Sequence, residues 1–302
     1  MIDVVSFGEI LWDVIGGTAH IGGAPFNLAA HAVRCGLRAA AVSRVGDDAL
    51  GHAALDAMAR HGVERRWTGI DPVHATGTVK VSLQDGQPAY RIRKDAAWDH
   101  IRLDARALKA LLAARPRAVC FGTLAQRSRL SRGTLVNMLD TLREAVIFYD
   151  VNLRQTFWTA PRVARGLARA SIVKTNADEA RILGGLLFNG ACEPAAFSAA
   201  VLRRHPAVRV VVVTSGADGC LVRGRGAAPI HCPCARVDVV DTVGAGDAFS
   251  AAFLAAWLRG ATARKAVEAG NECGAWVAAR RGAVPAPEEA AAGGVRGGHS
   301  SC

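Results

Sequence analysis

The chain has 302 residues, of which 51% are hydrophobic and 21% are charged, and this composition excludes a disordered polar chain. Lys and Arg outnumber Asp and Glu by 37 to 26, which gives a formal net charge of +11. The basic residues are spread along the chain without interleaved aromatics, so we expect anionic small molecules rather than nucleic acid as partners. The sequence also lacks a spanning apolar stretch and a secretory signal, and we therefore expect a cytoplasmic protein without a membrane partner.

The first part of the chain mixes strand and helix patterns with one hairpin signal. Two stretches of alternating polar and apolar residues, 75–83 and 88–93, flank Asp85-Gly86 and so predict a β-hairpin. Before them, periodicity predicts a strand at 4–8, a polar glycine-containing stretch at 13–23, a helix at 27–34, a strand at 39–45 and a helix at 50–61.

From residue 118 onward, short apolar strands alternate with helical patterns. The predicted strands are 118–121, 146–149, 172–174 and 208–214, and the predicted helices are 131–143, 160–169, 177–184 and 195–204. Such a series favours a parallel sheet covered by helices on both faces. We expect one α/β domain over residues 1–285, with a small β-lid drawn from 12–20 and 75–98 and a disordered tail at 286–302.

The strongest local signal is the segment DTVGAGDAF, which begins at Asp241. We expect a strand at 236–240 before it and a long apolar helix after it. The small residues would leave backbone N–H groups open to an anion at the positive end of the helix dipole. Asp247 would then be a base beside an anion hole, able to accept a proton from an attacking hydroxyl. The alternative is a glycine-rich turn in which Asp247 only caps the helix.

Two segments resemble the signatures of the ribokinase-like (phosphofructokinase B type) carbohydrate kinases. DTVGAGD at 241–247 resembles the C-terminal signature, and GGAPFN at 22–27 resembles the N-terminal one. The resemblance covers about residues 4–285. Its details are most similar to bacterial fructokinases, and the other segments that fit are GEILWD at 8–13, AWD at 97–99, FGTLA at 121–125, DVNLR at 150–154, NADE at 176–179 and TSGADG at 214–219.

The resemblance implies a fold, an activity and a set of partners. The fold would be a ribokinase-like three-layer α/β/α sandwich with a central, mostly parallel sheet and a small β-sheet lid. The activity would be ATP-dependent transfer of the γ-phosphoryl group to a hydroxyl of a ketohexose, with fructose as the expected sugar. Mg²⁺ would be the cofactor and K⁺ a further candidate, and the chain would form a homodimer through the lid.

The same resemblance assigns roles to individual residues. Asp247 would be the general base, and Gly244, Ala245 and Gly246 would supply the anion-hole amides. The sugar would be bound by Asp13, Gly22, Gly23, Asn27 and Arg154. The nucleotide would be bound by Asn176, Thr214, Gly216, Gly219 and Asn271, and the metal positions would be Glu179 for Mg²⁺ and Asp241 for a monovalent cation.

Several alternatives stay open from the sequence. Ala24 stands where ribokinases have lysine, which counts against ribose, but another small sugar such as 2-keto-3-deoxygluconate or a nucleoside remains a candidate. An acidic sugar could pair with Arg154 or with the hairpin arginines. Asn27 could be a helix N-cap. A non-catalytic sugar- or nucleotide-binding regulator is the rival from another class, whereas a dehydrogenase is disfavoured because the first glycine turn lacks G-x-G-x-x-G.

Overall fold

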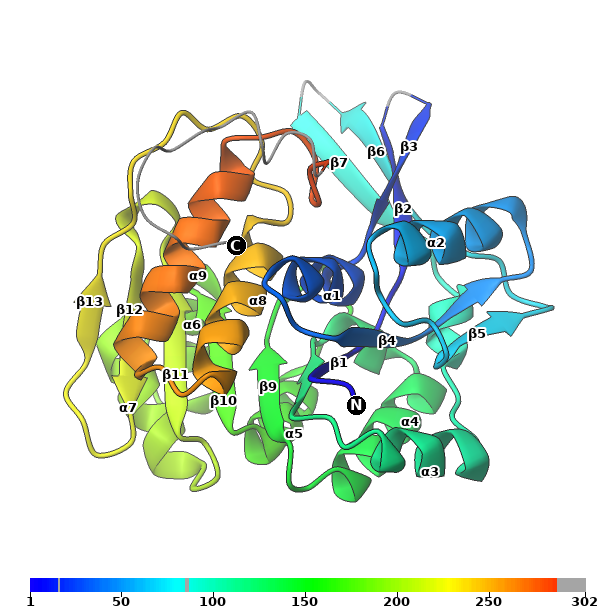
Figure 1. Cartoon of the computed structure of the whole chain (residues 1–302). Coiled ribbons are helices and arrows are strands. Elements are labelled where there is room, and N and C mark those ends of the chain that lie inside the picture. Colours follow the sequence, from blue (N-terminus) through cyan, green and yellow to red (C-terminus); the bar gives the residue numbers. More distant parts are fainter. Residues whose placement is uncertain (16, 85–86, 287–302) are drawn as a thin grey trace.

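The computed structural model of the chain describes residues 1–15, 17–84 and 87–286 (Figure 1). The turn expected at Asp85-Gly86 and residues 287–302 of the expected tail lie outside the described residues.

A large sheet of nine strands runs through the molecule in the order β13-β12-β11-β10-β9-β8-β1-β4-β5. From β11 to β5 the neighbouring strands are parallel, whereas β12 and β13 pair antiparallel at one edge. The strands are β1 Val4–Phe7, β4 Ala39–Gly46, β5 Thr68–Asp71, β8 Ala118–Phe121, β9 Val146–Asp150, β10 Ile172–Asn176, β11 Val210–Thr214, β12 Cys220–Gly224 and β13 Ile230–Cys232.

A second, four-stranded sheet has the order β3-β2-β6-β7 and lies at the upper right of Figure 1. Its strands are β2 Leu11–Ile15, β3 Thr18–Gly22, β6 Gly77–Gln84 and β7 Gln87–Ile92. The predicted hairpin is confirmed as β6 and β7. The sequence assigned 12–20 to the β-lid without dividing it into strands; in the structure β2 pairs with β6 in parallel and with β3 in antiparallel register. We call these four strands the small sheet.

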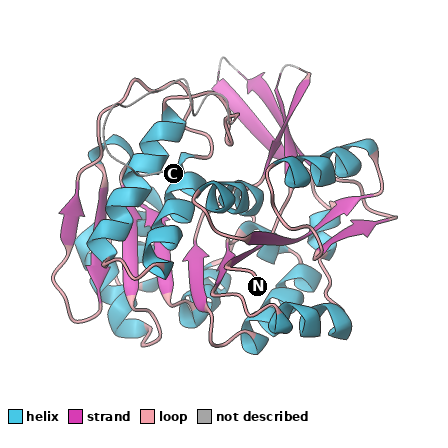
Figure 2. Cartoon of the chain, in the orientation of Figure 1, coloured by secondary structure: helices cyan, strands magenta, loops and turns pink. Residues whose placement is uncertain are grey.

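Helices cover both faces of the large sheet, which makes the three layers visible in Figure 2. Each face of the sheet has its own buried hydrophobic cluster. Val4 packs in one cluster and Val5 in the other, because successive side chains of a strand point to opposite faces. One face carries α1 Ala24–Arg34, α2 Ala49–Arg60, α8 Ala245–Leu258 and α9 Ala263–Ala278; the other carries α3 Ala105–Ala113, α4 Arg129–Thr141, α5 Ala160–Arg169, α6 Ala177–Leu187 and α7 Pro194–Arg204.

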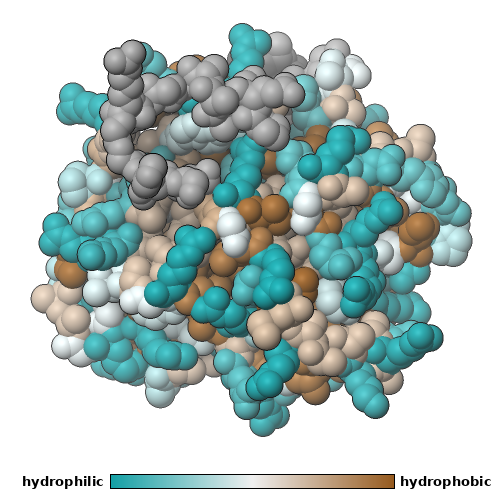
Figure 3. Space-filling view, viewed as in Figure 1, coloured by the Kyte–Doolittle hydropathy of each residue, from teal (hydrophilic) through white to brown (hydrophobic). Residues whose placement is uncertain are grey.

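Short 3₁₀ helices complete the described elements, namely η1 Ala97–His100, η2 Leu124–Arg127 and η3 Gly216–Asp218. No helix within the described ranges is long and apolar enough to cross a membrane. On the face shown in Figure 3, polar side chains alternate with apolar ones.

Two local predictions were wrong. The expected strand at 236–240 is a loop, because its valines find no neighbouring strand: Val239 and Val240 are exposed, and the Val240 N–H donates to the carbonyl of Ala278 at the end of α9. Helix α1 begins at Ala24 behind Gly23, so Asn27 lies inside the helix and is not its N-cap. Pro25 in the first turn favours this earlier start, since its missing N–H costs nothing there.

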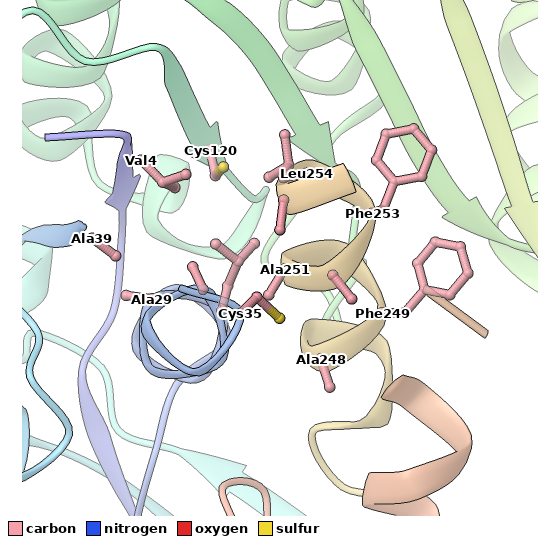
Figure 4. Close-up of a cluster of buried hydrophobic side chains, with 14 of the residues drawn as sticks. Val4, Ala29, Cys35, Ala39, Cys120, Ala248, Phe249, Ala251, Phe253 and Leu254 are labelled. Atoms are coloured by element: carbon pink, nitrogen blue, oxygen red, sulfur yellow. The ribbon is translucent and has the colours of Figure 1, made fainter. Parts of the chain in front are cut away.

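Helices α1 and α8 pack against each other in the centre of one layer. Figure 4 shows Ala251 and Cys35 between the two helices and Phe249 and Phe253 on the opposite side of α8. Small side chains at the contact let the helix axes approach closely, while the aromatic side chains fill the space beneath α8. Phe253 is fully buried, and its ring lies 5.9 Å from that of Phe148, centroid to centroid.

We predict that Phe253→Ala lowers the free energy of unfolding by about 3–5 kcal/mol, because it removes a buried aromatic ring and leaves a cavity. The control Leu186→Ala changes a side chain that is 59% exposed and should alter stability by less than about 0.5 kcal/mol. Denaturant titration of both variants measures the difference, and equal losses would contradict this view of the core.

Candidate active site

A pocket opens at the carboxyl ends of the central strands. Strand β1 lies between β4 and β8. The chain runs from β1 to β4 and β5 on one side and later returns to β8 on the other side, and ligands of α/β sheets bind where the strand order reverses in this way. The lining comes from the segments that follow β1, β8 and β9 and from the starts of α1 and α8, and it includes Glu9, Pro25, Thr123, Asp150, Asn152 and Asp247.

Asp247 lies in the first turn of α8 and contacts Asn27 from α1. The Asn27 side-chain N–H donates to Oδ2 of Asp247 at 2.8 Å. Oδ1 of the same buried asparagine has no hydrogen-bond partner among the described residues. Burial raises the pKa of Asp247 to about 6, against the lowering effect of the Asn27 hydrogen bond. A carboxylate with this pKa is ionised near neutral pH and can accept a proton.

A glycine-rich turn begins α8 beside that carboxylate. Gly244 caps the helix with φ 79°, a left-handed conformation that glycine adopts without strain. A side chain there would also collide with the carbonyl of Ala283, 2.4 Å from the ideal Cβ position. The first N–H groups of a helix have no partner within it, although the Ala245 N–H donates to the carbonyl of Thr242 at 3.3 Å. We call Gly244, Ala245 and Gly246, which the sequence predicts to bind an anion, the anion-binding turn.

Glycines bring the other end of the site close to α1. A Cβ at Gly22 would lie 2.6 Å from Oδ2 of Asp13, and a Cβ at Gly23 would lie 2.4 Å from the carbonyl oxygen of Glu9. Only glycine fits these two approaches. The predicted sugar residues Asp13, Gly22, Gly23 and Asn27 are thereby held at the junction of β2, β3 and α1.

Three carboxyl groups and one guanidinium share this region. Burial raises the pKa of Glu9 to about 7 and also raises the pKa of Asp13. Arg154, on the loop after β9, lowers the pKa of both of these groups and that of Asp247, so its charge acts on all three. Arg154 is itself exposed and can reach a ligand.

A buried ion pair lies under the anion-binding turn. Lys174 on β10 donates to Oδ2 of Asp150 at 2.8 Å, and Ser250 on α8 donates to the same oxygen at 2.8 Å. A Cβ at Gly246 would be 3.5 Å from the Lys174 ammonium, so this cation stands directly behind the turn. Burial disfavours the charged lysine, but Asp150 overcomes this and raises its pKa.

Asn176 and Glu179 form a reciprocal capping box at the start of α6. The Glu179 N–H donates to Oδ1 of Asn176, and Oε2 of Glu179 accepts from the Asn176 N–H at 3.0 Å. Oε1 of Glu179 accepts from the N–H of Leu153 at 2.7 Å. Glu179 is buried, and its bond to the Leu153 N–H fixes the loop that carries Arg154.

The predicted nucleotide residues gather beyond β11. Thr214 ends that strand, and Gly216 and Gly219 follow with φ 57° and 86°. A Cβ at Gly219 would lie 2.2 Å from the carbonyl of Cys232, so the turn before β12 packs against the end of β13. The amide of Asn271 on α9 donates to the same carbonyl at 3.1 Å. These residues therefore surround one edge of the sheet.

Asp241 joins the loop before α8 to the loop after α9. Its Oδ1 accepts from the N–H of Val243 and its Oδ2 from the N–H of Gly282, each at 3.0 Å. Asp241 is the residue that the resemblance assigns to a monovalent cation, and its contact with Gly282 links the two loops. These two hydrogen bonds hold the loop before the anion-binding turn against the loop after α9.

Three contributors to the site were missed when roles were assigned to residues: Glu9, Lys174 and Ser250. Lys174 could have been found, because a lone charge inside the apolar run Ile172-Val173-Lys174-Thr175 needs a buried partner. Ser250 carries no such signal, since only the packing of α8 on β9 brings it to Asp150.

Comparison with known proteins gives consistent matches over nearly the whole chain. Residues 1–290 match the family described as pfkB family carbohydrate kinase. Fructokinase-1 of Oryza sativa subsp. japonica is 28% identical over 93% of this chain and 93% of its own. The fructokinase of Vibrio cholerae O395, solved with fructose, ADP and calcium, is 26% identical, has a TM-score of 0.75, and the match covers 94% of this chain and 95% of that one. Its double mutant, solved with fructose, ADP and potassium, is 26% identical with a TM-score of 0.76 and 94% coverage of both chains.

We predict that Glu9→Gln stabilises the protein at pH 8 but not at pH 5. The folded-state pKa of Glu9 lies above its ordinary value of 4.5, at about 7, so the fold binds this proton more tightly and loses stability as the pH rises between those values. At about 1.4 kcal/mol per pKa unit, the variant should gain about 2–3 kcal/mol at pH 8. Denaturant midpoints at the two pH values measure the gain. Glu144→Gln, at an exposed position, is the control, and a gain that does not depend on pH would refute the buried-carboxyl interpretation.

Proposed function

The chain belongs to the pfkB family of carbohydrate kinases, and from this we propose that it transfers the γ-phosphoryl group of ATP to a hydroxyl of fructose. The rice relative is named as a fructokinase, and the related Vibrio cholerae enzyme was solved with fructose and ADP.

One contact in the pocket carries this proposal. Asn27 holds the Asp247 carboxylate through its amide N–H, while its own buried carbonyl oxygen lacks a partner. A sugar hydroxyl can donate to that oxygen, and an adjacent hydroxyl can donate to Asp247. An unpaired buried acceptor is costly, so a polyhydroxylated ligand would remove a penalty that the free protein bears.

The reaction follows from this placement. Asp247 accepts the proton of the attacking hydroxyl, whose oxygen then forms a bond to the γ-phosphorus as the bond to the β-phosphate oxygen breaks and ADP leaves. The amides of Gly244, Ala245 and Gly246 hold the charge of the transferring group, and the Lys174 cation behind them adds to the positive potential.

The balance of charge favours a neutral sugar over an acidic one. Arg154 acts on Glu9, Asp13 and Asp247; Arg127 also acts on Glu9 but is paired with Asp99, and the Lys174 charge is paired with Asp150. A sugar carboxylate such as that of 2-keto-3-deoxygluconate would meet more negative than positive charge here. Fructose requires only hydrogen bonds, which Asp13, Asn27 and the backbone beside Gly22 and Gly23 can provide.

The metal positions fit a hydrated ion. Both oxygens of Glu179 already accept backbone N–H groups at 2.7 and 3.0 Å, which suits contact with Mg²⁺ through water rather than direct ligation. When bound with ATP, Mg²⁺ would neutralise phosphate charge, and Asn176 and Glu179 would orient its water. The Asp241 loop would hold K⁺ through backbone carbonyls, in line with the potassium in the related Vibrio cholerae structure.

The nucleotide would lie along Thr214, Gly216, Gly219 and Asn271, with its phosphates toward the start of α8.

The small sheet would act as a lid over the sugar, since Asp13 belongs both to β2 and to the sugar site. It would also carry the homodimer contact, because β3 leaves an edge whose residues Thr18, Ala19 and His20 are exposed.

We predict that Asp247→Asn keeps the fold and ATP binding but lowers kcat by about 10²–10⁴-fold, because the amide cannot accept the proton. Asp238→Asn changes an exposed aspartate before the same turn and should keep full activity. Coupled measurement of ADP release gives the rates. If the Asp247 variant kept more than about a tenth of the wild-type rate, Asp247 would not be the general base.

Sugar identity is tested by the same assay with fructose, ribose, 2-keto-3-deoxygluconate, adenosine and glucose. We predict the highest kcat/KM with fructose and the lowest with the acidic sugar. Turnover of another sugar alone would refute fructose and leave the kinase assignment intact, whereas no sugar-dependent ADP release at all would favour a non-catalytic regulator.

A further inference from the structure

Three metal-binding side chains meet where the β6–β7 hairpin of the small sheet joins the rest of the protein. His74 lies on the segment that leads from β5 into β6, and Asp95 and His100 lie on the segment that follows β7, His100 at the end of η1. The two segments are joined by a backbone hydrogen bond from the Ala97 N–H to the Ala75 carbonyl. None of the three side chains belongs to the kinase site described above.

The ligand atoms of this cluster are close enough to share one ion. Nε2 of His100 lies 2.8 Å and Nε2 of His74 lies 3.8 Å from Oδ1 of Asp95, and one ligand atom from each residue falls within 4.8 Å of the others. Ligands at metal distances of about 2.0–2.2 Å in a tetrahedral site are themselves about 3.4 Å apart. The two rings are stacked, with centroids 3.5 Å apart and planes 14° apart, so the His100 ring would have to turn about its Cβ–Cγ bond before both in-plane lone pairs could reach one ion.

A carboxylate behind His74 orients its ring. Nδ1 of His74 lies 3.2 Å from Oδ1 of Asp71, and Asp71 is buried and paired with Arg44 at 2.9 Å. An Nδ1–H group that donates to Asp71 leaves a lone pair on Nε2, the nitrogen that lies 3.8 Å from Oδ1 of Asp95. Histidine ligands of metal ions are commonly held in this way by a second carboxylate.

The backbone at Asp95 is a second, independent observation. Asp95 has φ 53°, a left-handed conformation that is uncommon for residues other than glycine and that concentrates at functional sites. Oδ1 of its carboxylate lies 3.8 Å from Nε2 of His74 and 2.8 Å from Nε2 of His100. The Asp95 side chain is 74% exposed, whereas those of His74 and His100 are 25% and 19% exposed, so an ion can enter from solvent and meet two largely covered rings.

We propose that His74, Asp95 and His100 form a binding site for a divalent transition-metal ion, Zn²⁺ in the first place, which clamps the two ends of the β6–β7 hairpin together. Two imidazoles and one carboxylate are the donors that Zn²⁺, Co²⁺ and Ni²⁺ prefer, whereas Mg²⁺ and Ca²⁺ prefer oxygen ligands alone. Water would occupy the remaining coordination positions. The ion would restrict opening of the small sheet and would take no part in phosphoryl transfer.

Binding is tested on the full, untagged chain by equilibrium dialysis with Zn²⁺ and by the visible absorption of Co²⁺. We expect one equivalent that is lost in His74→Ala and His100→Ala and weakened about 10–100-fold in Asp71→Asn, because that change removes only the orienting carboxylate. His52→Ala is the matched control, since His52 pairs with Asp47 at 3.0 Å on an exposed surface without a third ligand. Binding unchanged in both histidine variants, which cysteine ligation would produce, overturns the site, and so does the absence of binding at micromolar Zn²⁺.

The clamp is tested by hydrogen exchange, independently of kinase activity. We expect Zn²⁺ to slow amide exchange in β6 and β7 of the wild-type protein and of His52→Ala, with no change in His100→Ala. Equal exchange with and without Zn²⁺ in a wild-type protein that binds the ion would overturn the clamp. Because neither readout uses a sugar or ATP, failure of the proposed kinase function would leave this test unaffected.

Discussion

The contact between Asn27 and Asp247 is the constraint on which the site depends. It joins residues 220 positions apart, and it exists only because α1 and α8 pack closely through small side chains such as Ala251. The anion-binding turn lies beside the carboxylate because Asp247 follows Gly246 directly in the first turn of α8. Moving either helix by the width of one larger side chain would separate Asn27 from Asp247, whose hydrogen bond spans 2.8 Å.

The pocket contains several carboxyl groups that the fold shields from water. Glu9 and Asp247 have raised pKa values because the fold buries them, and Arg154 and Lys174 limit that rise. The buried pair of Lys174 and Asp150 adds little stability, since desolvation offsets the attraction between its charges. The pair does place the Lys174 cation behind the anion-binding turn, where a bound phosphate would otherwise face mainly carboxylates.

The small sheet contributes Asp13 to the site through β2 and its glycine junctions through β3. Its other half, β6 and β7, pairs with β2 through β6, and along the chain it is connected to the core by the two segments that carry His74, Asp95 and His100. Asp13 pairs with Val79 of β6, so the proposed sugar site and the proposed metal clamp both lie against this hairpin.

Periodicity determined most elements from the sequence, because a parallel sheet buried on both faces leaves apolar strands between amphipathic helices. The motifs also placed Asp247 and Asn27 in one site. Tertiary structure decided the rest: a valine-rich stretch at 236–240 became a loop because it has no strand to pair with, and the position of β2 between β3 and β6 is set by pairing with a segment distant in the sequence. Ser250 and the burial of Glu9 likewise depend on contacts between distant segments, which a linear pattern does not contain.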